Sequence, residues 1–155
     1  MLITEFTLSG FLPSGIYSAA LGEVLERFGG SDARETQNHL LQLVVEAALH
    51  YPTIKRILVW GSFVTAKSEP NDLDYSVVVS VAHRITAIQE AHRRFLIPFD
   101  AKQFYGTDTG YLLMRDYPLE KYIEQLDFLC RNKRGACGII EISLWGEAIL
   151  TGGTQ

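Results

Sequence analysis

The sequence predicts an α/β or α+β protein in which a small mixed β-sheet packs against helices. Segments with apolar residues at three- and four-residue spacing alternate with short segments rich in apolar and β-branched residues. The chain shows no internal repeat, and its 155 residues, 47% of them hydrophobic, are enough for one substantial core. We therefore expect residues 1–155 to form a single domain.

Four segments have the pattern of helices, namely 18–30, 31–52, 82–96 and 117–131. The clearest is 31–52, where Ser31 can act as the N-cap, Glu35 falls near the capping-box position and Pro52 ends the helix. Its apolar residues recur on one face, at Leu40, Leu41, Val44, Val45 and Ala48. In the segment 18–30, Ser18 can act as the N-cap, and Gly29 and Gly30 end the helix.

Five segments are candidates for strands, namely 2–8, 54–60, 72–80, 98–106 and 137–145. The alternation in 2–8 is weak, whereas 57–60 is a continuous apolar run of the kind found in strands buried on both faces. The segment 72–80 is rich in β-branched residues. The strongest strand candidates therefore flank the polar stretch between residues 61 and 71.

That polar stretch holds the residues with the clearest chemistry. Gly61 and Ser62 follow the buried strand, and Asp72 and Asp74 come after nine intervening residues. Glycine lets the backbone approach a ligand closely, and Ser62 offers a hydroxyl and an N–H. Residues i and i+2 of a strand point to one face, so the two carboxylates would project together and repel unless a cation such as Mg²⁺ neutralises them. Taken alone, the acids could also be a solvated turn.

This pattern resembles the signature of the DNA polymerase β-like nucleotidyltransferase superfamily: an apolar residue, Gly-Ser, nine residues, then Asp-apolar-Asp-aromatic. The stretches "GFLPSGIY", "GSFVTAKSEPNDLD" and "RGACGIIEISL" are similar to those of small bacterial nucleotidyltransferase-like proteins. The resemblance implies a nucleotidyltransferase-like fold. It also implies that Gly61 and Ser62 bind a nucleoside triphosphate and that Asp72 and Asp74 bind Mg²⁺. The resemblance allows a site with two Mg²⁺ ions.

The resemblance also implies a third carboxylate from a later strand. Asp100, in the strand candidate 98–106, is our first choice for this catalytic and metal-binding acid. Asp108, in a "GTDTG" turn, and Glu141, between apolar residues, are the alternatives. Lys67 lies within the loop and could reach a phosphate of the nucleotide, or it could be an ordinary exposed lysine.

We therefore expect an Mg²⁺-dependent enzyme that transfers a nucleoside monophosphate to a hydroxyl of a small molecule, an RNA end or a protein side chain. By resemblance, a partner protein from a toxin-antitoxin or defence pair is plausible. The alternative is an inactive module of the same fold that binds a nucleotide or a partner. One departure favours that alternative: Cys137 stands before Gly138, where the resemblance leads us to expect a lysine.

Composition limits the other partners. The formal net charge of −4 predicts no global attraction to nucleic acid or anionic membranes, although a local basic patch can still bind RNA. No segment has the length of a membrane span or the pattern of a signal peptide, and the two cysteines have no zinc-ligand spacing, so we expect a cytoplasmic protein.

The remaining charged and aromatic residues are weaker candidates. Arg84, Arg93 and Arg94 lie on or near the predicted helix 82–96, and we expect them on its solvent-exposed face. Four aromatic residues follow it, Phe99, Phe104, Tyr105 and Tyr111, and they could stack on nucleobases. Their spacing favours core packing instead.

Overall fold

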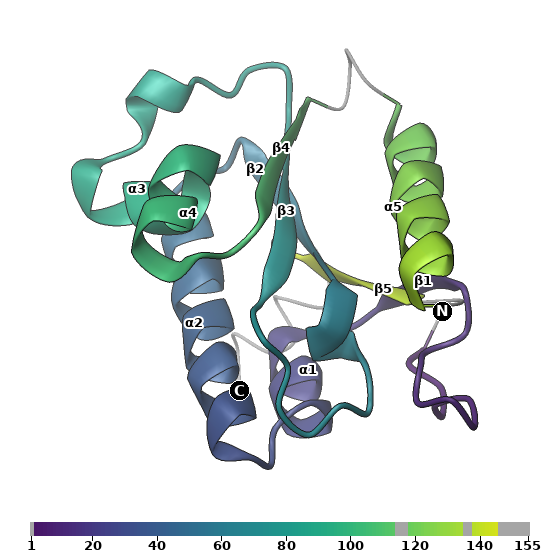
Figure 1. The fold of residues 1–155 in the computed structure, drawn as a ribbon. Coiled ribbons are helices and arrows are strands. Elements are labelled where there is room, and N and C mark those ends of the chain that lie inside the picture. The colour runs from purple at the N-terminus through teal and green to yellow at the C-terminus, as the bar shows by residue number, and fades with distance from the viewer. Residues whose placement is uncertain (1, 114–117, 135–137, 146–155) are drawn as a thin grey trace.

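The sheet has five strands in the described residues, in the order β1-β5-β2-β3-β4 (Figure 1). They are β1 (Gly15–Ser18), β2 (Ile54–Trp60), β3 (Asp74–Val79), β4 (Thr109–Leu113) and β5 (Gly138–Ser143). The β1/β5 and β3/β4 pairs are parallel, and β2 is antiparallel to both β3 and β5. The structure is a computed structural model that describes residues 2–113, 118–134 and 138–145, with only the backbone of residues 129–134. The class is α+β with a mixed sheet, as the sequence predicts.

Helices cover both faces of this sheet. They are α1 (Leu21–Arg27), α2 (Asp32–Ala48), α3 (Glu90–Leu96), α4 (Pro98–Tyr105) and α5 (Leu119–Arg134), with short 3₁₀ turns η1 (Gly61–Val64) and η2 (Ile85–Ala87). Helix α5 lies on one face, and the other four lie on the opposite side (Figure 1). The Ser31 hydroxyl accepts a hydrogen bond from the Arg34 N–H at 3.2 Å, which confirms the predicted cap of α2.

Alternation along the strands divides the core between these two faces. Ile57, Val59, Tyr75 and Val77 are buried against the helices of the larger layer, and α2 contributes its apolar stripe to the same cluster. On the other face, Leu58, Val78 and Ile139 pack with Leu126 of α5. Because side chains alternate, Asp74 and Ser76 share the face of Val78 under α5, whereas Leu73 and Tyr75 belong to the larger core.

Several elements differ from the sequence-based prediction, among them β4, which no predicted strand covers, and α1, whose N-cap is Ala20 and not Ser18. Residues 98–106 form helix α4 instead of a strand, because Pro98 suits a first helical turn and Gly106, at φ 68°, provides a left-handed C-cap. The weak candidate at 2–8 forms no strand, and the first strand is β1. The helix expected over 82–96 is confined to α3 and the turn η2.

Within the described ranges, no helix combines the length and the hydropathy needed to cross a bilayer.

Candidate functional site

Three carboxylates converge at one end of the β3/β4 pair. One oxygen from each of Asp72, Asp74 and Asp108 lies within 4.8 Å of the others. Burial differs sharply among them: Asp74 is 7% exposed, Asp72 is half-buried and Asp108 is exposed. This is the one group of three metal-ligating side chains in the part of the chain that the structure describes. The cluster therefore reaches from the protein interior to solvent.

Strand geometry explains why these acids meet. Asp72 and Asp74 are two residues apart at the start of β3, so their side chains lie on the same side of the chain. In the parallel register Tyr75 is opposite Thr109, which places Asp108 beside Asp74 on the neighbouring strand. The N–H of Tyr75 donates to the carbonyl of Asp108 at 3.1 Å and holds the two strand starts together. Adjacent strands lie about 4.8 Å apart, so neighbouring carboxylates in this register must be close.

Gly61 joins the Gly-Ser turn to the acids. It has φ 79°, a left-handed conformation that L side chains rarely adopt. A Cβ atom placed on Gly61 would lie 2.4 Å from Oδ2 of Asp74, well inside van der Waals contact. Glycine is therefore required here for two independent reasons, the backbone conformation and the room that the Asp74 carboxylate occupies.

Ser62 and Lys67 lie on the other side of this turn. Both line a pocket of about 440 Å³ that also includes Thr65 and the segment 9–11. Ser62 is 2% exposed, and Lys67 is exposed. The turn η1 is a single short 3₁₀ helix, so a ligand here would rely on individual N–H, hydroxyl and ammonium groups and not on a long helix dipole. Gly61, which lies against Asp74, precedes Ser62 of this pocket in the chain.

Arg34, which the sequence analysis missed, holds the Gly-Ser loop in place. Its guanidinium is buried and donates five hydrogen bonds, all to backbone carbonyls. The acceptors are Phe28 (3.1 Å), Phe63 (2.8 Å), Thr65 (2.5 Å) and Lys67, which accepts from both Nε (3.0 Å) and Nη2 (2.5 Å). Burial lowers the pKa of Arg34 below its ordinary value. The carbonyl oxygens carry partial negative charge, and this charge compensates the buried positive charge of the guanidinium.

Two further side chains at the start of α2 extend this support. The Ser31 hydroxyl donates to the carbonyl of Ser68 at 2.6 Å, and the Gln37 amide donates to the carbonyl of Pro70 at 2.6 Å. Together with Arg34, they tie much of the loop between Phe63 and Pro70 to one rigid helix. The shape of the loop thus depends on α2 as well as on the loop's own hydrogen bonds.

The other two candidates for the third acid lie in different surroundings. Asp100 is on α4, where its Oδ2 lies 3.6 Å from Nε of Arg93, and it does not belong to the carboxylate cluster. Glu141 is on β5, and its Oε2 accepts a hydrogen bond of 2.8 Å from Nη1 of Arg56 on β2. The structure thus groups Asp108, and not our first choice Asp100, with Asp72 and Asp74, because Asp100 lies on helix α4 and pairs with an arginine.

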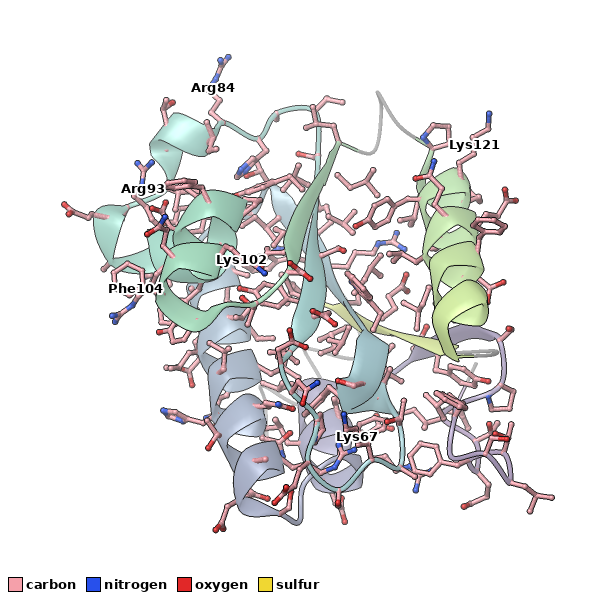
Figure 2. All side chains as sticks on the ribbon, viewed as in Figure 1. Lys67, Arg84, Arg93, Lys102, Phe104 and Lys121 are labelled. Carbon is pink, nitrogen blue, oxygen red and sulfur yellow. The ribbon has the colours of Figure 1, made fainter. Side chains whose placement is uncertain are left out.

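Two side chains next to the cluster differ in charge. Nζ of Lys102, on α4, lies 3.1 Å from Oδ1 of Asp108, with both side chains largely exposed (Figure 2). The phenol of Tyr75 donates to the carbonyl of Phe95, and burial raises its pKa to about 12. Tyr75 is therefore a neutral structural anchor at physiological pH, whereas Lys102 supplies a positive charge to the most exposed acid.

The fold and the cluster define a small α+β protein with three convergent carboxylates beside a Gly-Ser turn. Residues 4–143 match the model of a family of unknown function, DUF6932, and the chain belongs to that family. Comparisons with curated proteins and with solved structures gave no match. The activity must therefore be argued from the site itself. Cys137, the departure noted in the sequence, lies outside the described residues.

Proposed function

We propose that this protein is an Mg²⁺-dependent nucleotidyltransferase that moves a nucleoside monophosphate from a nucleoside triphosphate to a hydroxyl acceptor. The observation that carries the proposal is the convergence of Asp72, Asp74 and Asp108 within 4.8 Å, next to a Gly-Ser turn that contacts Asp74. The resemblance noted in the sequence is consistent with this reading. The family match leaves the activity open.

The carboxylate set fits a hard divalent cation. Three acids at this separation repel one another, and oxygen ligands of this type are the ones that Mg²⁺ prefers. When bound, Mg²⁺ would neutralise charge on the phosphates and on the attacking oxygen. Asp72 and Asp74 would hold the cation from one strand and Asp108 from the next, with Asp74 fixed by its burial and by Gly61.

The Gly-Ser turn would hold the leaving part of the nucleotide. In the proposed reaction, the acceptor oxygen forms a bond to the α-phosphorus and the bond to the bridging β-phosphate oxygen breaks. Pyrophosphate leaves, and the hydroxyl proton passes to a carboxylate or to solvent. Ser62 and Lys67 share a pocket beside Gly61, where a hydroxyl and an ammonium group could bind the β- and γ-phosphates. The protein's contribution is orientation and charge neutralisation.

A second candidate function, a binding module without turnover, is favoured by one contact. Lys102 lies 3.1 Å from Asp108 and gives the cluster an internal cation. Its ammonium group neutralises part of the carboxylate charge, so the cluster could persist without a divalent cation and without turnover. The module would then bind a nucleotide or a partner protein through the same pocket.

The test is transfer of label from α-labelled ATP, GTP, CTP and UTP in the presence of Mg²⁺. Acceptors would be total RNA, small molecules and the proteins encoded beside this one. We expect label to appear on one acceptor class and to fall at least about 100-fold in the double variant Asp72→Asn/Asp74→Asn, since it loses two of the carboxylates that would hold the cation. Label transfer that survives the double change would refute the site. Nucleotide binding with no transfer to any acceptor would favour the module.

A further inference from the structure

We propose that the surface formed by α3 and α4 binds a single-stranded nucleic acid and directs its end to the carboxylate cluster. The inference rests on the proposed function and names the acceptor class for that site. Four observations carry it: the local charge, the exposed rings, the packing of arginine on those rings, and the connection of the surface to the cluster.

The charge of this surface is opposite to that of the whole chain. Residues 84–105 contain four basic and two acidic residues, whereas the whole chain has a formal net charge of −4. The basic residues are Arg84, Arg93, Arg94 and Lys102. All three arginines are exposed. Arg93 and Lys102 pair with Asp100 and Asp108, so the attraction of this surface for a polyanion rests mainly on Arg84 and Arg94.

The rings on α4 face solvent, contrary to the core packing that their spacing predicts. Phe99 is 71% exposed, Phe104 is 65% exposed and Tyr105 is 39% exposed. Every large apolar side chain exposed on these two helices is aromatic, because the aliphatic ones are buried. Flat rings offered to solvent without aliphatic neighbours suit stacking on nucleobases, since every base has a π-face.

Arginine and ring are already in contact on this surface. The Arg94 guanidinium lies 5.8 Å from the ring centroid of Phe104 and 5.0 Å from that of Phe95. Phe95 also stacks on Tyr105 at 5.8 Å. Arg84, Arg93 and Phe104 lie on the side of the molecule away from α5 (Figure 2). In a bound nucleic acid, the arginine could contact a phosphate while a neighbouring base stacks on the ring.

The surface continues to the proposed site. Lys102 reaches from α4 to Asp108, and Tyr105 lines a pocket of about 380 Å³ together with Asp72 and Thr107. A nucleic-acid strand bound on α3 and α4 would therefore have its adjacent nucleotide close to the carboxylates. Ile85, next to Arg84, is 49% exposed. Protein interfaces are also rich in rings and arginine, but the excess of positive charge and the exposure of three rings on α4 favour a nucleic acid.

The test is fluorescence anisotropy with a labelled single-stranded RNA of about 12 nucleotides, within the range that one such groove holds. Nucleotide and divalent cation are omitted, so the result does not depend on catalysis. We expect Phe104→Ala to weaken binding about tenfold, because it removes one stacking ring. We expect Arg94→Ala to weaken binding and to reduce the slope of log K against log salt by about 0.7, the value for one phosphate contact.

Helix α5 supplies matched controls. Phe128 is 65% exposed, the same fraction as Phe104, and Lys121 is an exposed cation on the other side of the molecule (Figure 2). Phe128→Ala and Lys121→Ala should leave RNA binding unchanged. The inference is overturned if the protein binds no RNA, if the control variants lose as much binding, or if Phe104→Ala disrupts only self-association measured by sedimentation. RNA binding without label transfer would support the surface and count against the proposed enzyme.

Discussion

Replacing Arg34 with alanine is expected to lower the free energy of unfolding by about 3–5 kcal/mol, the range for removing one partner of a buried, fully paired charge. The substitution removes five hydrogen bonds and leaves the carbonyls of Phe28, Phe63, Thr65 and Lys67 without that donor. Each buried acceptor left unsatisfied costs about 1–3 kcal/mol. The loop that carries Ser62 and Lys67 should lose its fixed shape as well.

Urea unfolding of Arg34→Ala and Arg84→Ala measures this effect against a matched control. Arg84 is exposed on η2, so its removal should change stability by about 0.5 kcal/mol or less. Arg34→Lys should fall between the two, because one ammonium cannot reach acceptors spread over four residues. Equal stability of Arg34→Ala and Arg84→Ala would show that the loop does not depend on the guanidinium.

Gly61→Ala is expected to weaken binding of a divalent cation by at least about tenfold and to destabilise the fold by roughly 1–3 kcal/mol, the usual cost of a strained backbone position. The added methyl group would lie 2.4 Å from Oδ2 of Asp74, so the carboxylate or the backbone of Gly61 must shift and the spacing of the cluster should change. Cation binding by isothermal titration calorimetry and stability by thermal unfolding separate the two effects.

Gly106 provides the control for the backbone contribution. It also has a left-handed conformation, φ 68°, but an added Cβ would meet nothing within 4 Å. Gly106→Ala should therefore destabilise the fold without changing cation binding. If both variants bind the cation as the unchanged protein does, the close approach of Gly61 to Asp74 has no role in the site.

Much of the central fold could be predicted from local patterns. The Ser31 cap, the apolar stripe of α2 and the continuous apolar run of β2 all act within a few residues, and the structure confirms each. The pairing of Asp72 with Asp74 also follows from alternation along one strand.

The third acid could not be chosen by the same means. Its position depends on which strand pairs with β3, a long-range choice that we misjudged because we predicted a strand over residues 98–106. Pro98 near its start and Gly106 after its end are signals that favour a helix and could have corrected it. Asp108 would then stand immediately before the next strand.

Arg34 was missed, and the exposure of the rings on α4 was predicted wrongly, for a different reason. An arginine in the first turns of a helix normally faces solvent, and only the return of the loop between Phe63 and Pro70 over α2 buries it. Phe104 is hydrophobic by type, and its exposure depends on how α4 packs against β4 and α3. Neither property is encoded in local spacing.

Cation binding by the third carboxylate tests the proposed centre most directly. Manganese(II) can stand in for Mg²⁺ and can be titrated into the unchanged protein, Asp108→Asn and Asp100→Asn, with binding measured by calorimetry. Asp100 pairs with Arg93 at the surface, so its change should matter little to folding. We predict that Asp108→Asn weakens binding at least about tenfold and that Asp100→Asn leaves it unchanged. Loss of binding in Asp100→Asn with full binding in Asp108→Asn would contradict the site described above.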